Sequence, residues 1–302
     1  MDRLESMSVF AAVVDAGSFS GAGRRLQMPV PTVSRKIAEL EQHLKARLLV
    51  RSTRKLALTD AGEAYLEACR RILEDLGEAE RRAAGEYRAP RGGLTITAPL
   101  VFGRHQVLPV VTAFLREYPE IDVRLLLADR TLDLIDDHLD VAVRIGHLSG
   151  SALSAQRIGQ VRSVVCASPA YLAQAGIPDQ PADLAGHTCV SFDVAGMDSW
   201  NFRVDGKDLA QRVVSRLTVN GAESAVDAAV AGVGVTRVLS YQAAVPIQAG
   251  ALRLLLDRYA VPPVPVSLLH AGHRLMPSKL RAFLDFAGPR LRARLAALQV
   301  DS

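Results

Sequence analysis

The amino-acid sequence predicts a multidomain α/β protein, in which a small basic helical module and one long helix precede a larger domain of alternating strands and helices. Three observations lead to this prediction. Helical apolar spacing and a basic hairpin occupy residues 1–60, a proline-free helical pattern follows from 60 to about 87, and short strand-like runs alternate with helices from residue 94 onward. A length of 302 residues suits two or three domains.

The N-terminal module begins with two short helices, predicted by apolar spacing over residues 4–16 and 18–26. Gly17 suits the end of the first helix, and Ser18 suits the N-cap of the second. The break at 27–29 is short enough to predict a tight helix-turn-helix.

A third helix, predicted from about Pro31 to Lys45, has two different faces. Its apolar stripe consists of Val33, Ile37, Leu40 and Leu44, whereas the opposite face begins with polar side chains. A recognition helix needs this division, because one side packs on the other helices while the polar start enters the major groove of DNA.

Positive charge is concentrated in the same module. Between residues 20 and 55, nine Lys and Arg residues stand against two acidic residues, a local charge of +7, whereas the whole chain carries +4. Clustered cations favour double-stranded DNA as partner because they neutralise phosphates, and a basic hairpin suits a wing beside the minor groove. The predicted DNA contacts are Pro31, Thr32, Ser34, Arg35, Lys36, Arg51, Arg54 and Lys55.

A long helix capped by Thr59 or Asp60 follows the hairpin and runs to about residue 87. Charged residues cover most of it, so its single apolar seam needs a partner. Packing on its own domain is one alternative. We favour dimerisation with a second copy, because a protein that binds a two-fold symmetric DNA site needs two recognition helices about one DNA turn apart. The seam consists of Ala61, Tyr65, Ala68, Ile72, Leu76, Ala79 and Ala83.

The C-terminal part has a βαβαβ pattern, which is typical of a parallel sheet covered by helices. A late strand and a last helix, in which Pro289 is expected to cause a kink or break, would return to the first lobe and give two lobes with two crossovers. The predicted strands are 94–98, 121–127, 141–145, 161–167, 188–192, 212–219, 234–238 and 265–270, and the predicted helices are 104–118, 132–139, 169–175, 223–231 and 278–297.

Ligands of open α/β sheets bind beyond the carboxyl ends of the strands. Helix starts near residues 169 and 221–223 would offer free backbone N–H groups to an anionic ligand, although each residue in these loops also suits an ordinary turn or cap. The strand-end rule selects Pro99, Leu100, Val101, Phe102, Gly146 and His147 in the first lobe, and Ser168, Asp193 and Asn220 in the second.

Other features narrow the class of protein. The N-terminus does not resemble a signal peptide and no apolar run approaches the roughly 20 residues of a membrane span, so we expect a cytoplasmic protein without membrane contact. His270 and His273 have a metal-like spacing without a third ligand cluster, and we predict no metal or cofactor. Cys166 and Cys189 would form a redox switch only as neighbours. No set of nucleophile, base and orienting group is evident, which disfavours an enzyme.

Residues 1–60 resemble the winged helix-turn-helix of LysR-type transcriptional regulators. Family members often have a polar cap where this chain has Pro29, which leaves the first residue to touch DNA open. The matching pieces are Ala16-Gly17-Ser18-Phe19-Ser20, Arg25-Leu26, Val33-Ser34-Arg35-Lys36-Ile37, Leu40-Glu41, Arg47-Leu48-Leu49, Arg51-Ser52-Thr53-Arg54 and Leu58-Thr59-Asp60-Ala61-Gly62.

The resemblance extends more loosely over the rest of the chain. It implies a winged helix-turn-helix over 1–60, a dimerising linker helix and hinge over 61–90, and a two-lobed, periplasmic-binding-protein-like effector domain over 91–302. Lobe one would comprise 91–161 and 267–302, and lobe two 162–266. Residues 140–146 and 235–242 resemble the subgroup often called CrgA-like.

We therefore expect a sequence-specific regulator that binds a dyad promoter site as a homo-oligomer, a tetramer built from dimers. An unidentified small-molecule effector between the lobes would modulate it, and RNA polymerase is a further candidate partner. Two alternatives remain: a ligand-independent DNA-binding or architectural protein, and a cytoplasmic small-molecule receptor or enzyme that uses the βαβ domain. The basic module argues against the second.

Overall fold

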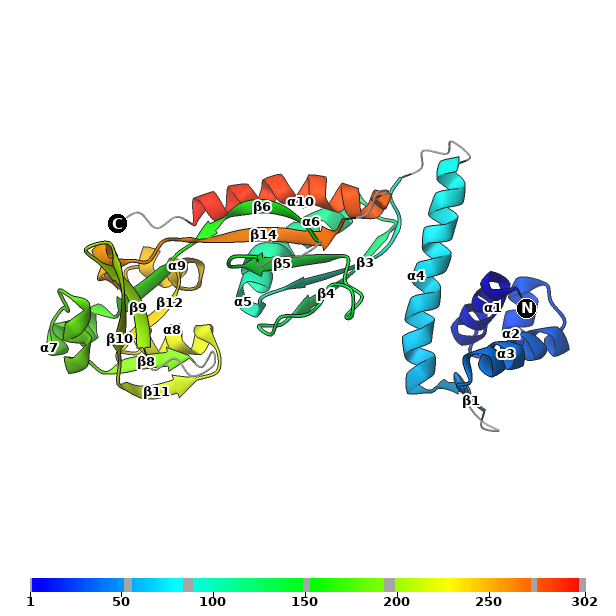
Figure 1. Ribbon diagram of the computed structural model, residues 1–302, viewed down its shortest axis with the longest axis horizontal. Coiled ribbons are helices and arrows are strands. Elements are labelled where there is room, and N and C mark those ends of the chain that lie inside the picture. Colours follow the sequence, from blue (N-terminus) through cyan, green and yellow to red (C-terminus); the bar gives the residue numbers. More distant parts are fainter. Residues whose placement is uncertain are drawn as a thin grey trace. The chain divides into compact units, whose positions relative to one another are not determined.

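The computed structural model describes residues 2–51, 56–83, 89–148, 153–192, 199–272 and 276–298. The chain divides into two compact units, Met1–Ala89 and Pro90–Ser302, each of which has its own core (Figure 1). Among the helices of the described ranges, none combines the length with the apolar composition that a membrane span needs.

The N-terminal unit contains a three-helix core, a small hairpin and a long helix. Asp2 caps the first helix by accepting from the N–H groups of Leu4 and Glu5, and Ser18 caps the second by accepting from Gly21. The third begins after Pro29 without a side-chain cap. The elements are α1 (Arg3–Asp15), α2 (Phe19–Leu26), α3 (Val30–Leu44), β1 (Leu49–Arg51), β2 (Leu56–Leu58) and α4 (Asp60–Ala83).

The predicted apolar stripe of α3 is confirmed, because Val33, Ile37 and Leu40 are fully buried. They pack with Phe10 and Ala22 of the first two helices. The base of α4 joins the same core through Leu66 and Cys69, which lie outside the predicted seam, and through Tyr65 of that seam, whose ring contacts Phe10. The helix-turn-helix is thus held from inside, and its polar face is left outward.

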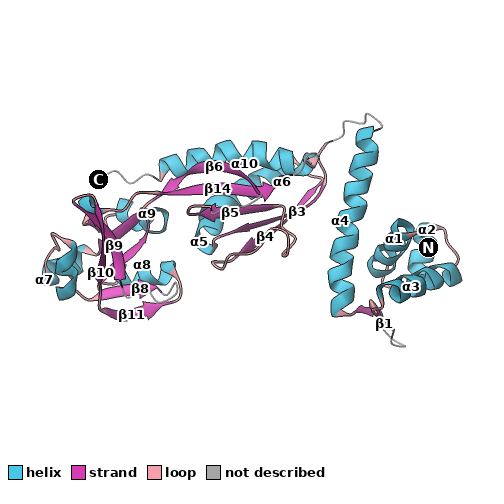
Figure 2. Cartoon of the chain, viewed as in Figure 1, coloured by secondary structure: helices cyan, strands magenta, loops and turns pink. Residues whose placement is uncertain are grey.

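Lobe one of the C-terminal unit is built on a mixed sheet with the strand order β4-β3-β5-β14-β6 (Figure 2). The first three are parallel, as predicted, and β14 returns antiparallel to both β5 and β6. The elements are β3 (Gly92–Ala98), α5 (Leu100–Phe102), the π-helical turn η1 (Gly103–Val107), α6 (Leu108–Glu117), β4 (Ile121–Leu127), β5 (Val141–Ile145), β6 (Leu153–Val161), β14 (Val264–Ala271) and α10 (Ser278–Ala297).

Lobe two has a second sheet, with the order β11-β8-β12-β7-β13, and a separate hairpin of β9 and β10. One sheet face packs on this hairpin, and the other packs on α8 and α9. The elements are β7 (Ser163–Ala167), α7 (Pro169–Ala175), η2 (Pro181–Gly186), β8 (Cys189–Phe192), β9 (Ser199–Val204), β10 (Lys207–Arg212), β11 (Ser215–Val219), α8 (Ala222–Val230), β12 (Val235–Leu239), α9 (Ser240–Gln248), β13 (Arg253–Leu255) and η3 (Asp257–Tyr259).

Two segments cross between the lobes. Arg162 separates β6 from β7, and the segment after β13 leads back to β14. The crossovers are tied together, because Arg162 forms an ion pair with Asp257 and its carbonyl accepts from the N–H of Ser240 at 2.8 Å. The chain returns to lobe one at Val264, where β14 begins, slightly before the predicted boundary at 267.

The structure corrects two predictions of helix geometry. Residues 132–139 form a hydrogen-bonded turn rather than a helix, because the Asp133 carboxylate accepts from the N–H groups of Ile135 and Asp136 and His138 adopts a left-handed φ of 54°. Those bonds also lower the pKa of Asp133. Pro289 does not break α10, which continues from Ser278 to Ala297.

Candidate nucleic-acid interface and effector site

The turn between α2 and α3 is tight enough to require a glycine. Gln27 adopts a left-handed φ of 53°, and the N–H of Met28 donates back to the carbonyl of Gly23 at 2.8 Å. A Cβ on Gly23 would lie 2.7 Å from the carbonyl oxygen of Met28, closer than side chains tolerate. This close approach sets the angle at which α3 leaves the turn.

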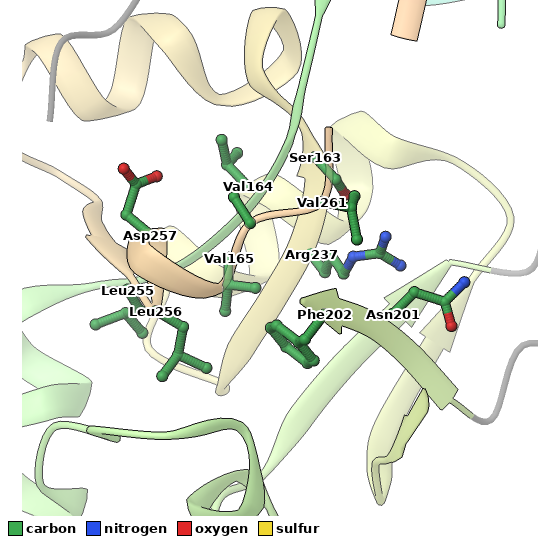
Figure 3. A pocket seen from close by; sticks show the side chains of 11 residues that line it. Ser163, Val164, Val165, Asn201, Phe202, Arg237, Leu255, Leu256, Asp257 and Val261 are labelled. Carbon is green, nitrogen blue, oxygen red and sulfur yellow. The ribbon is translucent and has the colours of Figure 1, made fainter. Parts of the chain in front are cut away.

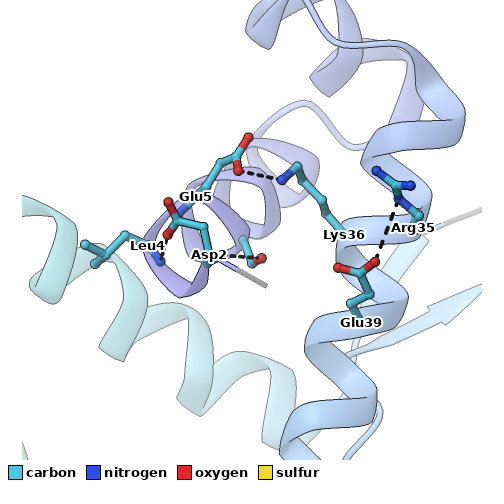
Figure 4. Close-up of polar contacts among 7 residues, drawn as sticks. Asp2, Leu4, Glu5, Arg35, Lys36 and Glu39 are labelled. Carbon is cyan, nitrogen blue, oxygen red and sulfur yellow. Dashed lines mark hydrogen bonds and ion pairs between the residues drawn. The ribbon is translucent and has the colours of Figure 1, made fainter.

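The start of α3 presents an accessible polar surface. Pro31 and Arg35 are exposed, and Thr32 and Ser34 are half-buried beside them. The side chain of Arg35 is 70% exposed, and its Nε lies 3.8 Å from Glu39 Oε1, too far for a strong hydrogen bond (Figure 4). Its guanidinium is therefore available to a guanine edge or a phosphate.

Lys36 lies differently from its neighbour. Its Nζ is 2.5 Å from Glu5 Oε2 on α1, and only 17% of its side chain is exposed (Figure 4). In this structure Lys36 therefore joins α3 to α1 instead of facing the surface where Arg35 lies. The predicted role of Lys36 as a DNA contact does not fit this placement.

The wing is attached to α3 by Glu41, which the sequence analysis did not select. Its Oε1 accepts from the backbone N–H groups of Leu48 at 2.8 Å and Leu49 at 3.1 Å. β1 and β2 pair as an antiparallel hairpin, as predicted. Arg54 and Lys55, at its expected tip, and the side chain of Arg51 lie outside the described residues.

Asp15 and Thr59 attach the long helix to the module. Asp15 forms ion pairs with Arg25 of α2 at 3.3 Å and with Arg70 of α4 at 2.5 Å. Thr59 is confirmed as the cap of α4, because its Oγ1 accepts from the N–H of Gly62 at 2.9 Å. Farther along α4, Ile72 of the predicted seam is 40% exposed.

The predicted effector residues of lobe one lie at one sheet edge, but they differ in access. Leu100 is exposed and its N–H donates to Asp129 Oδ1 at 3.0 Å. Val101 and Phe102 are buried in the core, so they do not face a ligand in this structure. Pro99 is half-buried before α5, and Gly146 and His147 follow β5 at the same edge of the sheet.

The predicted set in lobe two is only partly brought together. Asn220 is exposed after β11, and Asp193 lies outside the described residues. Ser168 is placed at the opposite edge of the sheet, because β7 runs antiparallel to β12, which is parallel to β8. It is buried and caps α7 by accepting from the N–H of Tyr171. The strand-end rule failed here because it assumed parallel strands.

A bridge between the lobes stands beside these residues instead. Arg104 Nη1 of η1 lies 3.1 Å from Glu223 Oε1 in the first turn of α8, and His105 Nε2 lies 3.3 Å from the same oxygen. Arg294 of α10 holds η1 in place by donating to Gln106 Oε1 at 3.1 Å and to the carbonyl of His105 at 2.7 Å. Arg104 and His105 lie just past the strand end that the sequence analysis considered.

A disulfide between Cys166 and Cys189 is excluded by the sheet. β12 lies between their strands, and the two side chains belong to cores on opposite faces. Strands two apart are separated by roughly 10 Å, beyond the roughly 7 Å that a disulfide spans. Burial also raises the pKa of Cys166 to about 12 and that of Cys189 to about 11, which keeps both thiols protonated.

Comparisons with known families cover almost the whole chain. Residues 4–63 match the family described as bacterial regulatory helix-turn-helix protein, lysR family, and residues 88–292 match the LysR substrate binding domain. The chain is 34% identical over 287 residues to the HTH-type transcriptional activator AaeR of Escherichia coli, covering 94% of this chain and 93% of that protein.

Solved structures agree with these matches. The structure of CrgA, a LysR-type transcriptional regulator from Neisseria meningitidis, aligns with a TM-score of 0.62 at 31% identity, covering 95% of this chain and 98% of that one. The full-length structure of AphB, a virulence activator from Vibrio cholerae, aligns with a TM-score of 0.61 at 28% identity, covering 94% and 98%.

Proposed function

This chain belongs to the LysR family of transcriptional regulators, and we propose that it binds an interrupted dyad at a promoter as a homo-oligomer in the cytoplasm. The observation that carries the proposal is the exposed polar start of α3, with Arg35 outermost, on a helix whose other side is locked into the core. Such a surface enters the major groove without any rearrangement of the module.

Direct reading of base edges is the role we propose for Arg35. A guanidinium can form two hydrogen bonds to the O6 and N7 atoms of guanine, whereas the hydroxyls of Thr32 and Ser34 suit bases or phosphates at shorter range. The wing follows α3 directly and is anchored by Glu41, so it would lie beside the neighbouring backbone.

Dimerisation through α4 would supply the second half-site. The buried side chains at the base of α4 fix its direction within the module, and the exposed Ile72 leaves apolar surface for a second copy. Two such dimers would give the expected tetramer.

A small anionic effector between the lobes is the proposed regulator. Arg104 supplies a cation that Glu223 occupies in this structure, with the imidazole of His105 beside it. An effector carboxylate would compete with Glu223 for Arg104, and it would shift the lobes if it prefers one of two arrangements.

Selection from a random DNA library followed by titration at several salt concentrations tests the proposal. We expect an enriched dyad whose half-sites lie about one or two DNA turns apart, bound at least about 10³-fold more tightly than scrambled DNA, with a steep salt dependence. If the selected DNA sequences shared no dyad and were bound no more tightly than scrambled DNA, the result would instead indicate an architectural protein.

A further inference from the structure

A pocket in lobe two lies on the sheet face that packs against the β9–β10 hairpin, the opposite face from α8 and the Arg104–Glu223 bridge. It is a shallow depression, and the volume of about 260 Å³ that is free of protein atoms there includes open solvent. Its lining combines apolar side chains with the polar side chains of Ser163, Asn201, Arg237 and Asp257 (Figure 3). The lining includes Ser163, Val165, Asn201, Phe202, Arg237 and Leu255.

Arg237 is the unexplained group of this pocket. It lies on β12 opposite Val165 of β7, so it shares a sheet face with the core around Val235 and Phe202. Within the described residues, no hydrogen bond or ion pair engages its half-buried guanidinium. Loss of hydration lowers its pKa. A cation that is partly removed from water without an acidic partner is unfavourable unless an anion joins it.

Asp257, the acidic residue in the lining, does not form an ion pair with Arg237. Asp257 forms an ion pair with Arg162 of the neighbouring crossover. Figure 3 shows its carboxylate at the far side of the pocket, whereas the guanidinium of Arg237 points toward the side where Asn201 and Ser163 lie. The Arg237 side of the pocket is therefore cationic, and the remaining lining is mostly apolar.

We propose that this pocket binds a small carboxylate with a short apolar tail, as a ligand site separate from the effector site between the lobes. The planar guanidinium matches a carboxylate with two parallel hydrogen bonds. The hydroxyl of Ser163 and the amide of Asn201 supply further donors, and Val165, Phe202 and Leu255 accept the tail.

The position of the pocket connects such a ligand with the movement of the lobes. Ser163 immediately follows the first crossover, and Asp257 and Val261 belong to the second. An occupant would touch both crossover segments at once. This inference goes beyond the proposed function, because it requires neither DNA binding nor a ligand between the lobes.

Methyl-detected NMR on the full chain, with labelled Val and Leu, tests the proposal by titration with butyrate and with butyramide at constant ionic strength. Butyramide has the same tail without the charge. We expect saturable shifts of the Val165 and Leu255 methyl signals with butyrate, half-complete at millimolar concentration as befits so small a ligand, and at least tenfold weaker binding of butyramide.

Three variants test whether the butyrate-induced shifts arise from binding at Arg237. Arg237→Met should abolish the saturable shifts, and Arg237→Lys, which keeps the charge but not the fork, should weaken binding severalfold. Arg116→Met removes an exposed cation at the end of α6 in lobe one and should leave these shifts unchanged. Equal responses to butyramide, persistence of the shifts in folded Arg237→Met, or their loss in Arg116→Met would each overturn the proposal.

Discussion

Ion pairs have different consequences in the two units of this protein. In the N-terminal unit, Lys36–Glu5 and the two pairs of Asp15 join helices that already share one core. In the C-terminal unit, Glu223 joins Arg104 and His105 across two lobes that otherwise have their own cores, apart from Tyr241 of α9, which packs against Phe102 in the core of lobe one. Ion pairs therefore help to fix the geometry of the proposed DNA-binding surface in the N-terminal unit. In the C-terminal unit they provide a contact between the lobes that can open.

The two kinds of ion pair differ because the elements that they join are held together by apolar packing to different extents. Breaking a pair between helices of one core exposes little, because the apolar contacts remain, so the pair sharpens a geometry that packing already imposes. Between lobes, partly exposed charges supply a modest share of the contact, and salt or a competing anion can replace them. We therefore expect the N-terminal unit to respond mainly to packing changes and the lobe contact to respond to charge.

Packing at the base of α4 should give the largest effect. A Cβ on Gly62 would lie 2.0 Å from the carbonyl oxygen of Leu48, so Gly62→Ala must displace the wing strand or the helix. We expect it to destabilise the N-terminal unit by about 3 kcal/mol, measured by urea denaturation of the full chain. Gly93→Ala, where a Cβ meets open space, is the control and should change stability little.

The variant Arg35→Ala should affect DNA recognition without affecting the stability of the protein. We expect operator affinity to fall by about 1–3 kcal/mol, since a bidentate base contact is worth that much, while the unfolding midpoint stays unchanged. Fluorescence anisotropy with operator and scrambled DNA measures both affinity and discrimination. Arg212→Ala removes the same charge from the exposed strand β10 and should leave operator affinity intact. An equal loss in both variants would mean that Arg35 acts only through net charge.

Lys36 should behave in the opposite way. Lys36→Met is expected to lower the stability of the N-terminal unit by about 1 kcal/mol, because it leaves Glu5 without its partner at 2.5 Å. A double-mutant cycle with Glu5→Gln, followed by urea denaturation, should show that the two losses are not additive. A loss of operator affinity as large as that of Arg35→Ala, with unchanged stability, would restore Lys36 as a direct DNA contact.

Much of the fold could be predicted, because local periodicity determines most of its elements. The apolar stripe of α3 and the parallel strands β3, β4 and β5 lie where the pattern places them. Strand β10 was not predicted, because almost all of its residues are exposed and no alternation marks it. Helix α9, which contains Pro246, was not predicted either, and the turn at Asp133 resembles a helix in apolar spacing alone.

The candidate sites were harder to predict, because they depend on pairing between distant residues. Arg35 follows from the polar start of one helix, whereas the fate of Lys36 depends on Glu5 in another. The placement of Ser168 depends on the direction of β7, which a single sequence does not specify. Glu223 and Arg104 are far apart in the chain, and only the arrangement of the lobes brings them together.

Neutralising the bridge between the lobes should give the smallest effect and the sharpest test of the comparison. The partners are partly exposed, with side-chain exposures of 62% for Arg104 and 37% for Glu223, so Glu223→Gln should weaken the contact by only about 0.5 kcal/mol. Hydrogen exchange of the η1 amides should then become about twofold faster, and the acceleration that added salt causes in the unaltered protein should disappear. Glu117→Gln, at the end of α6, changes the same charge outside the bridge and should retain the salt response. If Glu223→Gln left the salt response in place, the contact would be held by packing, and the contrast between the two units would fail.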